Sequence, residues 1–507
     1  MGIAGICGCV IRREIHFGSR KHRSPRGPTG KQSMTRTSIL YLSILTAVGL
    51  TVLGVLHLGA DLPMPAGTGE RMAGSESSVT GSLPAGLQKH LNSALSHLLL
   101  QLAILIAAAR VMGRVFGFLG QPPVVGEMAM GVLLGPSLFG WLAPEVFQFV
   151  FPPDTLDTLK LLSQIGVCLF MFAVGMELNV GMVKQKASTA VLVSHAGIVV
   201  PFLLGTALAF FLYTRLAAPG ATFTAFALFL GISMSITAFP VLARILQDRG
   251  LSRTSLGTTA ITCAAVGDVT AWNVLALVVA IAQSTNLAGS ALNLLLVLIF
   301  VVVMVVGVKR ILPRVLDRDL AAENPSRGAL ALVTVVVVTA ALCTEAIGIQ
   351  ALFGAFLAGT IMPDGHGFRH KLTVRLENFS SVLLLPLFFV YSGLRTQIGL
   401  LNGVGDWLVC LLIIVVATVG KLGGSALMAR LVGLSWRDAL SLGALMNARG
   451  LMELIALNIG YDMGILSARI FTMLVLMALV TTVLTGPLLH LFNRRESLLP
   501  TPEPARF

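Results

Sequence analysis

The chain has 507 residues, of which 55% are hydrophobic and only 12% are charged, and its mean hydropathy is +0.86. Soluble domains carry about 25% charged residues, so this composition excludes a soluble globular protein and indicates a polytopic membrane protein. The formal net charge of +13 does not indicate a nucleic-acid partner, because the basic residues lie in short clusters between apolar segments. That distribution is typical of the inner loops of membrane proteins.

The first 95 residues precede the main run of apolar segments. Residues 1–36 are polar and basic, and we expect either a cytoplasmic tail or a start site that truly lies at Met34. Residues 37–59 contain an apolar stretch typical of a transmembrane helix or signal anchor. Residues 60–95 are rich in Gly, Ser and Pro and predict an external linker.

Residues 96–492 predict the membrane domain. A transmembrane helix needs about 20 apolar residues, and a series of apolar segments of about this length fills this region. The predicted helices lie at 96–114, 121–141, 157–179, 188–214, 220–246, 255–283, 288–309, 327–347, 348–363, 379–396, 406–430, 438–459 and 464–491. Residues 493–507 predict a short cytoplasmic tail. The sequence therefore predicts an all-α polytopic membrane protein with about 13 core transmembrane helices and one N-terminal helix.

The distribution of Lys and Arg agrees with this set of helices. If residues 1–36 are cytoplasmic, the inner connections contain the basic residues and the outer ones hold few. The basic residues of the inner connections are Lys184, Lys186, Arg249, Arg253, Lys309, Arg310, Arg314, Arg318, Arg327, Arg369, Lys371, Arg375, Arg430, Arg437, Arg494 and Arg495. Inner loops carry such an excess. The pattern predicts a multi-pass protein of the cell membrane, most simply a bacterial inner membrane, with both termini in the cytoplasm.

The predicted helix at 220–246 is interrupted by a proline. Pro240 lacks a backbone N–H and clashes with the carbonyl four residues earlier, at Ile236. A carbonyl freed at membrane depth is tolerated only where it lines a cavity or coordinates a ligand. A simple proline kink is the alternative for this segment taken alone. The oxygens freed here would belong to Ile236, Thr237 and Ala238.

A second interruption lies at 438–459, where Asn447, Arg449 and Glu453 fit poorly against lipid. A polar seam packed between helices is the alternative. With 288–309 as a connector, six helices precede it and six follow, and each half has its interruption in its fifth helix. Interrupted helices at corresponding places of inverted halves are typical of a transporter with a binding site near the midplane. The sequence therefore predicts inverted six-helix repeats with two broken helices.

Two charged residues lie deep inside the segments that are next to the two interrupted helices in the sequence. Asp268 is about 13 residues into its predicted helix, and Lys421 lies about 13 Å or more from either end of its own. A charge at this depth costs several kcal/mol or more and usually lines an ion or proton path. We expect Asp268 and Lys421 to face one cavity, with a purely structural ion pair as the alternative.

Six motifs resemble the monovalent cation:proton antiporter family, which includes bacterial sodium/proton antiporters, Kef potassium-efflux proteins and plant cation/proton exchangers. They are GQPPVVGEMAMGVLLGP at 120–136, SITAFPVLARIL at 235–246, GDVTAW at 267–272, FGAFLAG at 353–359, PLFFV at 386–390 and NARGLMELI at 447–455. They lie in the family's order within residues 97–492. The resemblance implies a 13-helix inverted repeat, with a panel-like dimerisation domain and a core domain that holds two crossed, unwound helices. It also implies homodimers with an elevator-like movement of the core.

The chain departs from the family pattern in two ways. Electrogenic members carry two adjacent aspartates in the helix that matches 255–283, whereas this chain has Gly267 at the first position and Asp268 at the essential second one. Lys421 resembles the lysine that pairs with the first aspartate, so we expect it to pair with Asp268 instead. Kef proteins and plant exchangers continue into a cytosolic regulatory domain. This chain ends soon after its last apolar segment, so we expect no nucleotide or glutathione gating.

A single carboxylate suggests the mechanism. Asp268 would hold either a proton or a cation, and competition for this one site would couple the two flows. Hard cations prefer oxygen ligands. The expected exchange residues are Asp268, Lys421, Arg449 and Glu453, and the expected cation ligands are Asp268, Ile236, Thr237, Ala238 and Asn447. We therefore expect a secondary transporter, not an enzyme, that exchanges Na+ or K+ for protons electroneutrally and has no cofactor.

Potassium conduction and proteolysis are the alternatives to antiport. Kef-like potassium efflux would appear as flux without counter-transported protons, whereas a potassium channel would need a filter such as Thr-Val-Gly-Tyr-Gly, which the sequence lacks. Gly267-Asp268 and Tyr461-Asp462 resemble the two motifs of intramembrane aspartyl proteases. The motif order is reversed, however, and Ala265 replaces the first glycine, so a protease is disfavoured.

Overall fold

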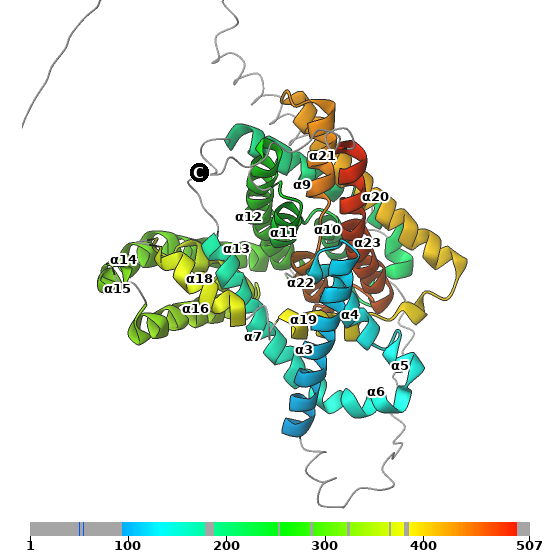
Figure 1. Cartoon of the computed structure of the whole chain (residues 1–507), viewed down its shortest axis with the longest axis horizontal. Helices are drawn as coiled ribbons and strands as arrows, with labels where there is room; N and C mark the ends of the chain where they lie inside the picture. The colour runs from blue at the N-terminus through cyan, green and yellow to red at the C-terminus, as the bar shows by residue number, and fades with distance from the viewer. Residues whose placement is uncertain are drawn as a thin grey trace, which may run out of the picture. The chain divides into compact units, whose positions relative to one another are not determined.

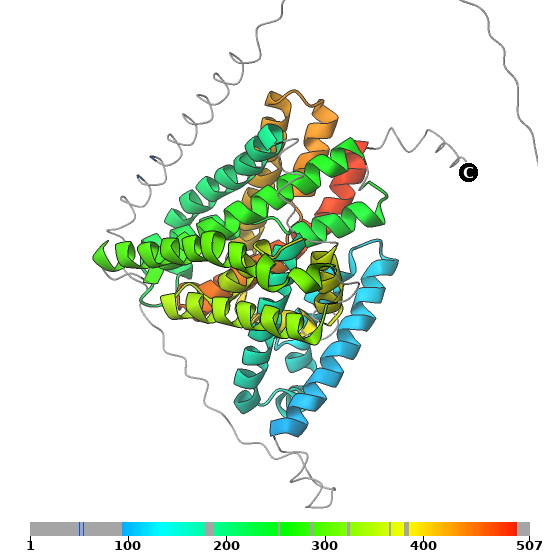
Figure 2. The same cartoon turned by 90° about the vertical axis from the view of Figure 1, so that its left-hand side faces the viewer.

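The computed structural model describes residues 50, 54, 94–177, 187–251, 254–283, 287–321, 325–364, 367–379 and 385–493. These residues are almost entirely helical (Figures 1 and 2). The predicted N-terminal tail, leading helix and linker, and the predicted C-terminal tail, lie almost wholly outside the described residues.

The helices follow the order of the apolar segments. They are α3 Ala94–Phe118, α4 Pro123–Leu134, α5 Phe139–Leu142, α6 Pro144–Val150, α7 Pro153–Glu177, α9 Ala187–Leu216, α10 Phe223–Ser233, α11 Phe239–Asp248, α12 Ser255–Gln283, α13 Leu287–Val302, α14 Lys309–Val315, α15 Asp317–Ala321, α16 Arg327–Ile347, α17 Ala351–Thr360, α18 Phe368–Phe379, α19 Leu385–Leu394, α20 Val404–Leu431, α21 Trp436–Met446, α22 Leu451–Asp462 and α23 Ala468–Asn493. A π-helical turn over Val303–Val308 joins α13 to α14.

The membrane-spanning character of the chain is confirmed. Among the described residues, nine helices are long and apolar enough to cross a membrane, and the bent pair α21 and α22 would make ten. Two further apolar helices, α10 and α17, are shorter. Every predicted segment between 96 and 491 contains at least one helix. The all-helical, multi-pass architecture is therefore as predicted, while the number of about 13 spans stays a prediction.

Helix packing divides the membrane domain into two groups. Helices α9–α12 pack with α20–α23, and we call these the core group; α3, α4 and α7 pack with α16–α19, and we call these the panel group. Helix α13 contacts both α12 and α16. The largest apolar cluster centres on core-group side chains such as Phe226, Phe229, Leu457 and Phe471. The broken helices both belong to the core group.

Glycines bring helices α4 and α19 of the panel group into backbone contact (Figure 1). A Cβ atom added at Gly393 would lie 1.9 Å from the carbonyl carbon of Gly131, and one added at Gly131 would lie 2.2 Å from the carbonyl oxygen of Phe389. Small residues allow this close approach, which is how helices associate in a membrane without a hydrophobic driving force between them. The α4–α19 contact therefore depends on glycine at both positions.

We expect Gly393→Ala to destabilise the folded protein. The added methyl group would force α4 and α19 apart, and overpacking of this kind typically costs about 1–3 kcal/mol. Thermal unfolding in detergent should show a lower midpoint. Gly423→Ala in α20 is the control, because a Cβ there meets nothing within 4 Å and Ala favours a helix. Equal midpoints for the two variants would contradict the close α4–α19 contact.

Candidate functional site

The two broken helices meet at their breaks. Residues 234–238 separate α10 from α11, and residues 447–450 separate α21 from α22, which are bent by 46°. The N–H of Ala238 donates to the carbonyl of Ala448 over 3.0 Å, which joins the two unwound segments directly. A Cβ atom at Gly450 would lie 2.9 Å from Val241, so glycine is needed for this approach. Both breaks lie where the sequence predicts them.

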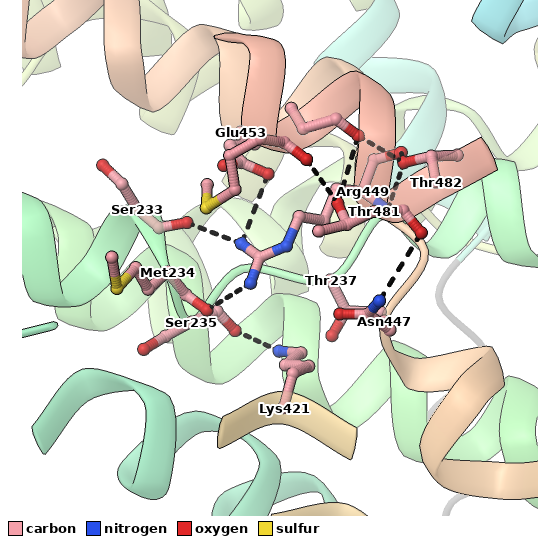
Figure 3. Close-up of polar contacts among 12 residues, drawn as sticks. Ser233, Met234, Ser235, Thr237, Lys421, Asn447, Arg449, Glu453, Thr481 and Thr482 are labelled. Carbon is pink, nitrogen blue, oxygen red and sulfur yellow. Dashed lines mark hydrogen bonds and ion pairs between the residues drawn. The ribbon is translucent and has the colours of Figure 1, made fainter. Parts of the chain in front are cut away.

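Arg449, a fully buried side chain in the second break, holds the end of the first half-helix. Its guanidinium donates to the carbonyl oxygens of Ser233 over 2.8 Å and of Met234 over 2.7 Å, and it pairs with Glu453 over 3.3 Å (Figure 3). These carbonyls are at the C-terminal end of α10, where helical partners are missing and the helix dipole is negative. Arg449 therefore caps α10 from the opposite broken helix.

Helix α23 fixes the second unwound segment. The N–H of Arg449 donates to the hydroxyl of Thr482 over 2.9 Å, and that hydroxyl lies 2.9 Å from the Arg449 carbonyl (Figure 3). The amide of Asn447 donates to the carbonyl of Thr481 at the longer distance of 3.5 Å. Glu453 lies in the first turn of α22, where a carboxylate complements the helix dipole. These contacts satisfy most of the polar groups that the break exposes.

Lys421 also binds a carbonyl of the first break. Its side chain is fully buried in α20 and donates to the carbonyl of Ser235 (Figure 3). We expected a direct ion pair with Asp268, but none joins these two side chains in the described structure, although their charges interact through space. The freed carbonyls of the break explain the difference. They need donors in a dry environment, and the ammonium group supplies one.

Asp268 is the carboxylate without a bonded partner. It lies in α12 with 2% of its surface exposed, and neither carboxylate oxygen makes a hydrogen bond within the described residues. The groups that act on it electrostatically include Lys421 and the backbone N–H of Phe239. Phe239 begins α11, so this N–H belongs to the positive end of a helix. Asp268 therefore lies in a favourable field but remains unpaired.

The oxygens of the other predicted cation ligands differ in whether they already take part in hydrogen bonds. The carbonyl of Ala238 already accepts from the N–H of Leu242 over 3.0 Å. The hydroxyl of Thr237 donates to the carbonyl of Met446 over 3.3 Å, which leaves its lone pairs available. Ile236 is buried in the unwound segment, outside both half-helices. These positions make Thr237 and Ile236 better candidate ligands than Ala238.

Asn447 keeps one oxygen for a possible ligand. In the described part of the chain its side-chain Oδ1 has no hydrogen-bond partner, and the residue is fully buried. Two of its neighbours also keep single atoms without partners, Oε1 of Glu453 and Nε of Arg449. The crossing of the broken helices is thus closely but not completely hydrogen-bonded.

Two cavities lie between the helices of the described residues. The first has a volume of about 450 Å³ and lies between the turn that joins α3 to α4 and the core helices α11 and α23, with Arg244, Arg249 and Thr482 in its wall. Because Thr482 also binds the backbone of Arg449, this cavity reaches the second break. The second cavity, of about 460 Å³, is mostly apolar and lies between α12, α13, α16 and α17. Asp268 lines neither of them.

A polar cluster around Arg395 joins the panel group to the core group. No sequence motif predicts this cluster. The Arg395 guanidinium lies 2.7 Å from Asp462 and 3.1 Å from the side-chain oxygen of Asn458, and Lys160 lies 3.5 Å from Asp462. Arg395 also donates to the hydroxyl of Tyr391. The only sequence signal is a charge near the end of an apolar segment, and this is common. The sequence does not distinguish the buried serines Ser194 and Ser425 from ordinary serines in apolar helices.

The chain matches known proteins over the whole membrane domain. Residues 102–494 match the family described as "Sodium/hydrogen exchanger, transmembrane". The chain is 44% identical over 392 residues to the Na(+)/H(+) antiporter NhaS4 of Synechocystis sp., covering 77% of this chain and 96% of that protein. It is 39% identical to the Cation/H(+) antiporter 17 of Arabidopsis thaliana and 32% identical to the K(+)/H(+) antiporter 1 of Saccharomyces cerevisiae. The aligned region covers 78% of this chain and 48% of the Arabidopsis protein, and 79% of this chain and 47% of the yeast protein. The chain therefore spans about half the length of these two relatives.

The fold is similar to that of a solved structure as well. The sodium proton antiporter MjNhaP1 from Methanocaldococcus jannaschii superposes with a TM-score of 0.57, covering 78% of this chain and 97% of that one at 15% sequence identity. At this identity the likeness supports the fold alone. The family match, in contrast, extends over both broken helices and Asp268. The chain therefore belongs to the family of transmembrane sodium/hydrogen exchangers.

Proposed function

We propose that this protein exchanges a monovalent cation, Na+ or K+, for protons across the membrane, and that Asp268 holds either ion in turn. The observation that carries this proposal is the buried carboxylate with two unpartnered oxygens beside the start of α11. An unpaired buried carboxylate is costly, and binding a proton or a cation relieves that cost. The names of the relatives support this activity, and they include both sodium and potassium as substrates.

The cation would be held by oxygens from three elements. Asp268 supplies the charge, Thr237 and Ile236 supply oxygens from the first break, and Asn447 supplies its free Oδ1 from the second. Alkali cations are hard and prefer such ligands. Ala238, which we also expected to contribute, is less suitable because its carbonyl is already bonded within α11.

Lys421, Arg449 and Glu453 would support the site without holding the transported ion. The two cations bind carbonyl oxygens of the first break, and Glu453 balances Arg449. Their charges stay in place while Asp268 exchanges its ion. Replacing one proton by one monovalent cation then leaves the local charge unchanged, which favours electroneutral exchange at a ratio of one to one.

Kef-like potassium efflux is the second candidate. The relatives that the chain resembles are named as antiporters, which favours antiport over efflux. The resemblance of the chain to its family also leads us to propose a homodimer with an elevator-like movement of the core group. The loop charges lead us to propose the cell membrane, with cytoplasmic termini.

Asp268→Asn should abolish exchange, because an amide can neither release a proton nor neutralise a cation. The measurement is the dequenching of a pH-sensitive dye in everted vesicles after addition of Na+, K+ or Li+, and the signal should fall to that of vesicles without the protein. Asp406→Asn is the matched control, since Asp406 lies in the first turn of α20 and only approaches Arg469 at 4.0 Å. Exchange that survives in Asp268→Asn would refute the proposed function.

Electroneutrality predicts that voltage does not drive the transporter. In proteoliposomes that hold the same potassium gradient, adding valinomycin imposes a membrane potential and should leave the initial rate of Na+/H+ exchange unchanged within about 20%, because no net charge moves. A protonophore control verifies that the potential is present. A clear dependence of the rate on the sign of the potential would contradict the ratio of one to one.

Lys421→Ala and Arg449→Ala should differ in severity. The first leaves one carbonyl of the break without its donor, whereas the second leaves two carbonyls and the buried carboxylate of Glu453. Removing one member of a buried ion pair costs about 3–5 kcal/mol. We expect Lys421→Ala to fold and to exchange ions at a reduced rate, and Arg449→Ala to show a much lower thermal midpoint. Complete loss of exchange by a stably folded Lys421→Ala would place Lys421 in the transport cycle itself.

A further inference from the structure

Two buried serines of the core group differ from the other buried hydroxyls. Ser233, Thr206 and Thr481 each donate to the carbonyl four residues earlier, over 2.7 to 2.8 Å, which is the usual solution for a hydroxyl in an apolar helix. Ser194 in α9 and Ser425 in α20 are fully buried, yet their hydroxyl oxygens have no hydrogen-bond partner among the described residues. An unpaired buried polar group costs about 1–3 kcal/mol. Binding of a ligand to these two hydroxyls would therefore remove an energetic cost.

Both hydroxyls lie where α9 packs against its neighbours. The Ser425 Oγ lies 2.4 Å from the position that a Cβ atom would take at Gly197 of α9. Ser194 precedes Gly197 by three residues, so the two positions lie on one face of α9. Helix α9 packs against both α12 and α20. The two serines thus belong to one three-helix contact.

This contact contains Asp268 and Lys421. The Ser194 Oγ lies 3.0 Å from the position of a Cβ atom at Gly267, the residue before Asp268, so the absence of a side chain there leaves the hydroxyl uncovered from that direction. Ser425 follows Lys421 by four residues on α20 and shares its face. Unpartnered oxygens of Ser194, Ser425 and Asp268 therefore lie on α9 and on the two helices that pack against it, α20 and α12.

We propose that the hydroxyls of Ser194 and Ser425 complete the cation site of Asp268 on the side of α9 and α20, and that they set its affinity and its selectivity between Na+ and K+. A hydroxyl oxygen is a hard ligand that suits a partly dehydrated alkali cation. It carries no charge, so it binds the cation without changing the one-for-one replacement of a proton. This inference rests on the proposed function and adds two ligands from helices outside the breaks.

The test is the cation dependence of exchange by Ser194→Ala and Ser425→Ala in proteoliposomes. We expect the apparent KM for the transported cation to rise about five- to tenfold, as for the loss of one ligand interaction of about 1 kcal/mol. The maximal rate should stay within about twofold, and the ratio of the KM values for Na+ and K+ should change. Thr206→Val in α9 is the matched control, because its hydroxyl is already bonded to the carbonyl of Phe202. Its KM should not change.

Thermal unfolding provides a second test, because a cation ligand and a purely structural serine predict different effects of added cation on the thermal midpoint. Without added cation, the two alanine variants should be at least as stable as the unmodified protein, because each loses an unpaired buried hydroxyl. Addition of Na+ or K+ should then raise their thermal midpoints by less than it raises that of the unmodified protein. If an alanine variant does not fold, Ser→Cys at the same position keeps a side chain of similar shape and replaces the hard oxygen by a somewhat larger, soft sulfur, with the same expected rise in KM.

The outcomes separate the two proposals. If both serine variants keep the KM values and the cation-induced rise in midpoint of the unmodified protein while Asp268→Asn is inactive, the serines are not ligands and the antiport function stands. If Asp268→Asn still exchanges ions, the proposed function fails, and the assignment of the serines fails with it.

Discussion

Every backbone carbonyl at membrane depth needs a donor, and in this protein Arg449 meets that constraint where it is most severe. The break after α10 exposes the last carbonyls of a half-helix inside a dry bundle. Arg449 binds two of them, those of Ser233 and Met234, and Lys421 binds the next, that of Ser235. Because Arg449 comes from the other broken helix, the same bonds also hold the crossing together (Figure 3). The unwound geometry of the site depends on this pair of cations.

The division of labour among the buried charges follows from these bonds. Arg449 and Lys421 are occupied by carbonyls, and Glu453 is occupied by Arg449. Asp268, in contrast, keeps both oxygens without hydrogen bonds within the described residues. A charge that is already paired is expensive to disturb, whereas an unpaired carboxylate gains from any proton or cation that reaches it. The framework therefore leaves Asp268 free to bind an ion, as the proposed function requires.

The sequence predicts the helices, both breaks and the two deep charges, because lipid imposes strong local rules. Pro201 and Pro487 lie inside the continuous helices α9 and α23, so the proline at 240 alone does not prove a break. The polar run from Asn447 to Glu453 at the corresponding place of the second half is what makes both breaks predictable from the sequence. The partner of Lys421 is not predictable in this way. Its choice of the Ser235 carbonyl over Asp268 depends on where the freed carbonyls point. Ser194 and Ser425 are invisible in the sequence, since serine is ordinary in an apolar helix and only packing shows that these hydroxyls lack partners.

The strengths of the two sets of polar contacts indicate where the protein can rearrange. At the crossing, Arg449 and Glu453 are fully buried, and leaving one member of such a pair without the other costs about 3–5 kcal/mol. The cluster that joins the panel group to the core group is wetter: the side chains of Arg395, Asp462 and Lys160 are 16%, 24% and 32% exposed. Ion pairs that water reaches contribute about 0–1 kcal/mol each. Of these polar contacts, the pairs between the two groups are therefore less costly to break than the Arg449–Glu453 pair at the crossing, which is consistent with the movement of the core group that we propose.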